Sequence, residues 1–470
     1  MIKIANSAAQ ACLPTIQWPV TQKVVALVRR HPWATLAVGV SIVGVLALTA
    51  RAGVSLYKLF KLHYEPANKR RLNLDEALAK LCQNDPSLTS LDLDCYRLGG
   101  TDIQNLARAL EVNTTLESLD LGWNNINAAG VQALAGVLER NKTLKELVLF
   151  GNAIGDEGAQ ALASALEENT TLESLNLGLN NINAAGAQAL ASALEENTTL
   201  ESLDLGWNNI NAAGAWALAG VLERNKILKD LWLNNNAIGD KGARALADAL
   251  EGNTTLIRFN VGGNAIGNDG AKAIAIALGG NKTLRYLHLD RNCICREGAE
   301  ALAKMLKGDT ALSMLSLDGN GMDVEGAKAL ADALKENKTL TMCSLSGNAI
   351  GDGGAEALAE ALKGNTTLTH LDLEDNSIGD GGAKAIADAL RVNQTLKEIR
   401  LQSNGITDVG AKAIVKALKG SNKKLECLNL DRNPISAEVG RSLAGDLKEH
   451  ETLKSFYCNN GRHSLLKGIY

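Results

Sequence analysis

The chain has 470 residues and a formal net charge of −4 at pH 7. This charge excludes the extended basic face of a nucleic-acid-binding protein, so we expect no nucleic-acid partner. Eight cysteines are scattered without the spacing of a disulfide framework, which favours a reducing compartment.

Residues 1–31 form an acid-poor N-terminal segment, since the first acidic residue of the chain is Glu65. Residues 32–50 follow and contain no charged side chain. As a helix this segment would be about 29 Å long, close to the roughly 30 Å hydrocarbon core of a bilayer. We therefore predict a transmembrane helix at residues 32–50, followed by a basic linker at residues 51–71.

The linker carries more basic residues than the segment before the predicted helix. In a single-pass membrane protein this bias places the following domain on the cytoplasmic side. Three other interpretations of the N-terminal region remain open. It could be a cleaved signal peptide, with Ala50-Arg51-Ala52 as the cleavage site, an organelle transit segment, or a helix packed against the rest of the protein.

An asparagine recurs through the remainder of the chain at a period of 28 residues, with one final step of 29. A fixed period of this length is typical of stacked-repeat proteins. The repeated asparagines are Asn124, Asn152, Asn180, Asn208, Asn236, Asn264, Asn292, Asn320, Asn348, Asn376, Asn404 and Asn433.

Each repeat contains a strand and a helix. In one unit Leu119 and Leu121 alternate with polar or small residues, which predicts a short strand with its leucines inward. Leu134, Ala135 and Leu138 then share one helical face. Stacked units bury these faces, with the strands in a parallel sheet on the concave side because helices are wider than the strand spacing. We expect the repeated asparagine to satisfy backbone groups where the chain turns into the core.

The unit Leu-x-x-Leu-x-Leu-x-x-Asn, followed by Ile-Gly-Asp-x-Gly-Ala as at Ile154–Ala159 and Ile378–Ala383, resembles the ribonuclease-inhibitor-type leucine-rich repeat. The resemblance implies an α/β leucine-rich-repeat solenoid, a curved horseshoe of about fourteen strands, over residues 72–460. Residues 461–470 form a C-terminal tail. This repeat class occurs in NOD-like receptor sensing domains, Ran GTPase-activating proteins and bacterial effectors.

Nine Asn-x-Thr sequons lie at the turn from helix to strand. They match the acceptor sites of N-glycosylation, but their common position favours a role in the turn, where asparagine ends the helix and threonine begins the strand. The sequons begin at Asn113, Asn141, Asn169, Asn197, Asn253, Asn281, Asn337, Asn365 and Asn393.

The concave face collects aromatic and charged residues at outward strand positions and just after them. Four of the chain's ten tryptophan and phenylalanine residues lie there, and exposed aromatics and arginine are typical of binding interfaces. Repeat duplication is the competing explanation, because the sequence Leu119–Asn124 recurs as Leu203–Asn208. The predicted partner-binding residues are Trp123, Phe150, Asp204, Trp207, Asp230, Trp232, Arg258, Tyr286, His288 and Asp290.

The repeats offer only weak candidates for a catalytic or metal site. His288, Asp290 and Ser316 could mimic a Ser-His-Asp set, but an open sheet offers no oxyanion donors. Cys293 and Cys295 lack a second pair of metal ligands. We therefore expect no enzyme, no metal and no cofactor.

The sequence favours a membrane-tethered scaffold that binds a protein partner on its concave face. A bacterial effector, or a NOD-like-receptor-like regulator of host or innate immune signalling, would be such a scaffold. The alternative function is a GTPase-activating regulator of a small Ran-like GTPase, although the acidic tail typical of that family is absent.

Overall fold

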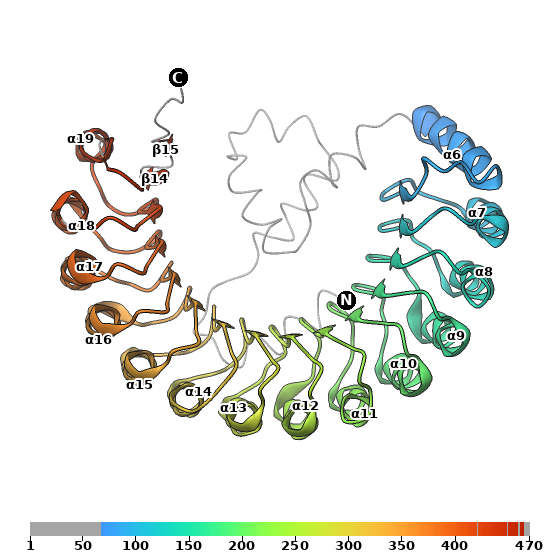
Figure 1. Cartoon of the computed structure of the whole chain (residues 1–470), viewed down its shortest axis with the longest axis horizontal. Helices are drawn as coiled ribbons and strands as arrows, with labels where there is room; N and C mark the ends of the chain where they lie inside the picture. The colour runs from blue at the N-terminus through green and yellow to red at the C-terminus, as the bar shows by residue number, and fades with distance from the viewer. Residues whose placement is uncertain (1–66, 421, 449, 459–460, 465–470) are drawn as a thin grey trace, which may run out of the picture.

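A computed structural model describes residues 67–420, 422–448, 450–458 and 461–464. Helices and strands alternate along this part of the chain, with the strands on the inner face of an arc and the helices on its outer rim (Figure 1). The predicted transmembrane segment at residues 32–50 lies outside the described residues. None of the described helices combines the length and apolar character needed to cross a bilayer.

The outer layer consists of helices of about three to four turns. They are α6 Ala67–Cys82, α7 Gly100–Val112, α8 Ala128–Leu138, α9 Gly155–Glu168, α10 Ala184–Glu196, α11 Ala212–Leu222, α12 Gly239–Gly252, α13 Asn268–Gly280, α14 Arg296–Lys307, α15 Val324–Glu336, α16 Gly351–Gly364, α17 Asp380–Val392, α18 Asp408–Gly420 and α19 Ala437–Leu447.

The inner layer is one sheet whose strands follow chain order, with parallel pairing from β1 to β14 and an antiparallel last strand. The strands are β1 Ser90–Asp92, β2 Ser118–Asp120, β3 Glu146–Val148, β4 Ser174–Asn176, β5 Ser202–Asp204, β6 Asp230–Trp232, β7 Arg258–Asn260, β8 Tyr286–His288, β9 Met314–Ser316, β10 Met342–Ser344, β11 His370–Asp372, β12 Glu398–Arg400, β13 Cys427–Asn429, β14 Ser455–Cys458 and β15 Gly461–Ser464.

The ends of the domain differ from the predicted boundaries. Helix α6 begins at Ala67, inside the range 51–71 assigned to the basic linker, because alanine, lysine and arginine there favour helix. Strand β15 lies in the range 461–470 assigned to the tail and pairs antiparallel with β14. The sheet therefore ends in a hairpin at its C-terminal edge.

The core lies between the two layers and is built from the predicted leucines. Leu119, Leu121 and their equivalents are buried, as are Leu134 and Leu138 on the helix side. Neighbouring helices approach closely because glycine and alanine face each other: a Cβ on Gly242 would lie 2.9 Å from the Cβ of Ala215. Cys343 and Cys458 occupy inward strand positions, and burial raises their thiol pKa values to about 12 and about 11.

The repeated asparagines form a buried hydrogen-bond ladder, as predicted. The Nδ2 of Asn152 donates to the carbonyls of Leu121 and Leu149, at 3.0 and 2.8 Å. Its Oδ1 accepts from the backbone N–H groups of Asn124 and Ile126, at 3.1 and 2.8 Å. One amide therefore satisfies four backbone groups from two repeats, which links each repeat to the next.

The sequon asparagines form a second buried ladder at the opposite end of the strands. Asn197 is 4% exposed, and its Nδ2 donates to the carbonyl of Leu166 at 2.7 Å. Its Oδ1 accepts from the N–H groups of Thr199 and Leu200, at 3.0 and 2.8 Å. The predicted turn role of these asparagines is confirmed.

Candidate functional site

The concave face presents its side chains in rows, because the strand pairing is in register from repeat to repeat. The first strand residue gives one row, which contains Asp230, Arg258 and Tyr286. The third strand residue gives a second row, which contains Trp232, Asn260 and His288. The residue two positions after each strand adds a third row. Side chains from one row on neighbouring strands lie roughly 4.8 Å apart along the sheet.

Six predicted site residues meet at the middle of the arc, on β6 to β8 and the turn after β8. The rings of Trp232 and His288 lean together over Asn260, with centroids 5.8 Å apart and planes at 35°. The Nδ1 of His288 lies 3.7 Å from the Oδ1 of Asp290. This half-buried group, with Asp230, Arg258 and Tyr286, is called the central cluster below.

Arg258 joins the two sides of the central cluster. Its Nη1 lies 3.0 Å from both carboxylate oxygens of Asp230 on β6, while its guanidinium carbon lies 5.1 Å from the centre of the Tyr286 ring on β8. The ion pair and the cation–π contact hold the guanidinium in place. An arginine held between a carboxylate and an aromatic ring is typical of an interface anchor.

Trp123 and Phe150 form a separate pair near the N-terminal end of the arc. Their rings meet edge to face with centroids 5.7 Å apart. Each ring also lies on a glycine of the next repeat: a Cβ on Gly151 would come within 2.8 Å of Trp123, and one on Gly178 within 2.7 Å of Phe150. Trp123 is therefore half-buried, not exposed as predicted. This pair contributes to packing as well as to the surface.

Asp204 and Trp207 lie between the two aromatic groups. The Oδ1 of Asp204 accepts a hydrogen bond from the backbone N–H of Gly206 at 2.8 Å, and burial raises the pKa of its carboxyl. Asp120 makes the same bond to Gly122 at 2.8 Å. The carboxyl of Asp204 therefore closes the turn after its strand.

Trp123 and Trp207 share an unusual backbone conformation with the equivalent residue of the other repeats. The residue before each repeated asparagine, and Cys95 before Tyr96 in the first repeat, has a φ between 53° and 71°. This left-handed conformation costs a residue other than glycine about 1–2 kcal/mol. The row contains Cys95, Trp123, Gly151, Leu179, Trp207, Asn235, Gly263, Arg291, Gly319, Gly347, Asp375, Ser403 and Arg432.

Towards the C-terminal end the concave face becomes acidic. Burial raises the pKa of the Asp318 carboxyl, and the charge of Asp290 raises it further. Burial also raises the pKa of Asp372, to about 6. At Asp290 burial acts in the same direction, but His288 and Ser316 outweigh it and lower the pKa.

The structure brings His288, Asp290 and Ser316 close together, because His288 pairs in register with Ser316. Ser316 is only 4% exposed. It lowers the pKa of Asp290, and at Asp318 it offsets only part of the rise in pKa that burial causes. A hydroxyl has a single proton to donate, and a Ser316 hydroxyl directed at either carboxylate is not placed as a nucleophile activated by His288.

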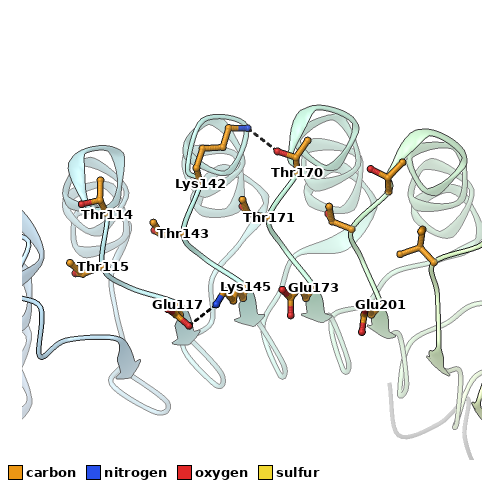
Figure 2. A pocket seen from close by; sticks show the side chains of 13 residues that line it. Thr114, Thr115, Glu117, Lys142, Thr143, Lys145, Thr170, Thr171, Glu173 and Glu201 are labelled. Carbon is orange, nitrogen blue, oxygen red and sulfur yellow. Dashed lines mark hydrogen bonds and ion pairs between the residues drawn. The ribbon is translucent and has the colours of Figure 1, made fainter.

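A shallow groove of about 520 Å³ lies on the flank of the arc, where the helices lead into the strands (Figure 2). Threonines line it together with Lys142, Lys145 and Glu117. Lys145 pairs with Glu117 at 2.9 Å, and Lys142 donates to the hydroxyl of Thr170 at 3.3 Å. Since these polar groups have partners within the groove, it is a weaker binding candidate than the central cluster.

Trp216 was not identified from the sequence as an exposed aromatic residue, although its position in the repeat distinguishes it. It lies on the outer helix α11 and is 72% exposed. Gln132, Gln188 and Lys272 occupy the same place in other repeats, so alignment by the 28-residue period singles it out.

Comparison with known families gives two matches. The TMOD/LMOD leucine-rich domain matches residues 70–172 and 300–419. The leucine-rich repeat matches five consecutive units, at residues 168–191, 196–219, 224–247, 252–275 and 280–303. A search of curated proteins finds no match.

Solved structures that match this chain include the yeast Rad7–Elc1 complex, at 15% identity and a TM-score of 0.47, covering 89% of this chain and 93% of that chain. An internalin from Listeria monocytogenes matches at 21% identity and a TM-score of 0.48, covering 84% and 95%. Actin-binding site 2 of leiomodin-1 matches at 24% identity and a TM-score of 0.25, covering 34% and 79%. With the repeats and both family matches in agreement, the chain is a leucine-rich-repeat protein-binding scaffold with a TMOD/LMOD-like leucine-rich domain.

Proposed function

We propose that this chain is a membrane-tethered scaffold that grips a protein partner on its concave face, with the central cluster as the anchor. The observation that carries the proposal is the group formed by Trp232, His288, Arg258 and Tyr286 in the middle of the arc. These side chains stand on a rigid parallel sheet, so little ordering entropy remains to be lost when a partner binds.

The central cluster has the composition of a binding hot spot. Aromatic residues and arginine dominate the energy of protein interfaces, and they do so near the centre of the buried surface. The ion pair of Arg258 with Asp230 fixes the guanidinium while leaving it partly exposed, with 46% of its side chain accessible. A partner would cover this group from the open side of the arc.

The proposal is tested with a partner recovered by pull-down and two tryptophan variants. Trp232→Ala should weaken binding by at least about 2 kcal/mol, the scale of an interface hot spot, without a large change in melting temperature. Trp216→Gln is the matched control, because Trp216 is exposed on the outer helices and should leave the affinity unchanged. If Trp232→Ala binds normally and Trp216→Gln does not, the partner binds the convex face.

The tether has its own test. Residues 32–50 are expected to keep the full-length chain in the membrane during alkaline carbonate extraction, and a variant lacking residues 1–66 should be released. Release of the full-length chain would contradict the tether and leave the concave binding face untouched.

The identity of the recovered partner would distinguish between narrower roles for the same scaffold. A host or innate immune signalling protein would identify an effector or a NOD-like-receptor-like regulator, and stimulated GTP hydrolysis by a small Ran-like GTPase would identify the alternative function. Actin joins the panel of candidate partners, since the part of leiomodin-1 that matches this chain is an actin-binding site of that protein.

A further inference from the structure

Next to the central cluster, strands β9 to β12 and the turns after them carry a group of hydrogen-bond acceptors. Asp318 follows β9, Asp372 ends β11, Glu374 follows β11, and Gln402 follows β12. These four residues are called the acidic strip. The in-register pairing of β9 to β12 places the strip along one side of the concave face.

Within the acidic strip one buried hydrogen-bond acceptor, the Oε1 of Gln402, has no donor. Asp318 accepts from the hydroxyl of Ser344 at 2.6 Å and from the N–H of Ser346 at 2.8 Å. The Nε2 of Gln402 donates to Glu374 at 2.5 Å. Gln402 is only 8% exposed, yet its Oε1 has no hydrogen-bond partner. Rotating the amide would place this oxygen against the Glu374 carboxylate, so the orphaned acceptor stays in the strip.

The positive charge next to the acidic strip is that of Arg400, which already pairs with two carboxylates. Arg400 lies 2.6 Å from Glu398 and 3.4 Å from Asp372. In the part of the chain that the structure describes, Asp318 and Glu374 take part in no ion pair. Buried acceptors without donors are costly, and buried carboxylates without a counter-charge more so. The strip therefore suits a ligand that supplies both donors and positive charge.

A metal ion does not fit this arrangement. The described residues contain no group of three or more histidine, cysteine, aspartate or glutamate side chains that could hold one. From Asp318 to Gln402 the third row spans three strand spacings, about 14 Å, which is the length of four or five residues of extended chain. Lysine and arginine are the side chains that bring several donors and a positive charge to such a row.

We propose that the partner places a short extended segment bearing two or three lysine or arginine side chains on the acidic strip. This inference rests on the proposed function, since it assigns the chemistry of the partner beside the central cluster. A lysine or arginine there would donate to the carboxylates of Asp318 and Glu374.

The raised pKa of Asp372 gives the interaction a pH dependence. Asp372 faces Glu374 on its own turn, Arg400 on β12 and the charge of Asp318. Because its pKa is about 6, the strip gains negative charge as the pH rises from 5 to 7. A basic segment should bind more tightly over that range.

A fluorescent nonapeptide of alternating lysine and serine tests the acidic strip without the natural partner. Wild-type protein at low salt should bind it, and should bind it more weakly at high salt and at pH 5. The triple variant D318N/D372N/E374Q should lose at least tenfold in affinity. The control variant E356Q/E360Q/D388N removes the same charge from exposed positions on α16 and α17, and it should stay within about twofold of the wild type.

Absence of wild-type binding, or equal losses in the two triple variants, would overturn the proposal. If the strip variant fails to fold, Glu374→Gln alone replaces it, since glutamine can keep a hydrogen bond to Gln402. Binding of the recovered partner to these variants distinguishes the proposed basic segment from the proposed concave scaffold. Loss of partner binding in Trp232→Ala but not in the strip variant would refute the basic segment and retain the scaffold, whereas normal binding in both would refute both.

Discussion

The aromatic and acidic halves of the concave face stand on the same scaffold and differ in the contacts that their side chains make with one another. From β2 to β8, Trp123 packs on Phe150, Trp232 on His288, and Arg258 pairs with Asp230. From β9 to β12, burial and like charge raise the pKa values of Asp318 and Asp372. The leucines and asparagines therefore set the fold, while the concave rows differ in chemistry from repeat to repeat.

Truncation of one core leucine in each half tests whether the two halves share one scaffold, and it should change stability more than any other variant below. Leu205→Ala in the aromatic half and Leu373→Ala in the acidic half both remove a side chain that is 0% exposed. Each should lower the free energy of unfolding by about 2–5 kcal/mol, because each opens a cavity in the leucine core. Urea denaturation measures both. A much smaller loss at one of the two sites would show that the halves are packed differently.

The next prediction is a pH dependence of stability that arises in the acidic half alone. The pKa of Asp372 rises from 3.8 to about 6 in the folded protein, so the folded state binds the proton more tightly than the unfolded state. Its contribution to stability is therefore most favourable below about pH 4, falls as the pH rises through about 6, and is constant above that. The full shift corresponds to about 3 kcal/mol.

Urea denaturation of wild type and Asp372→Asn at pH 4.5 and pH 7 checks this prediction. The variant should gain stability relative to the wild type as the pH rises, since asparagine cannot ionise. Titrating groups that do not interact with Asp372 contribute equally to both proteins and cancel in the difference. An equal difference at the two pH values would show that the Asp372 carboxyl is not held in an unfavourable charged state.

A smaller effect should distinguish the two aromatic groups, the Trp123–Phe150 pair and the central cluster. Trp123→Ala removes a ring that packs on Phe150 and Gly151, and should destabilise the protein by about 1–3 kcal/mol as a partly buried side chain is lost. Trp232→Ala should cost less stability and more partner affinity. Thermal melts of both variants decide this, and a reversed order of stability would move the structural role to Trp232.

The smallest effect is expected on the outer rim. Trp216→Gln should leave the melting temperature unchanged, because the indole is 72% exposed and glutamine occupies the equivalent place at Gln132 and Gln188. Scanning calorimetry measures the comparison. A lowered melting temperature would mean that the indole stabilises its neighbouring helices.

The 28-residue period was enough to predict the strands, the buried leucines and the asparagine ladder, because each is required in every repeat. It did not predict that Trp123 is half-buried, since that depends on Gly151 one repeat away, which leaves room for the ring. The left-handed backbone was also missed, although Gly151, Gly263 and Gly319 share the register of Trp123 and Trp207. The orphaned oxygen of Gln402 could not be predicted from the sequence, because it depends on the hydrogen bond of the same amide to Glu374.

The sequon ladder makes this domain a reporter of the compartment in which it folds. At all nine sequons Nδ2, the atom to which a glycan would be attached, is buried and donates to a leucine carbonyl of the preceding repeat at 2.6–3.2 Å. A sugar at Asn197, for example, would remove its bond to Leu166 and force the turn open. Glycosylation and folding therefore compete for the same atoms, so a chain that met the glycosylation machinery before folding would carry sugars where its repeats must stack.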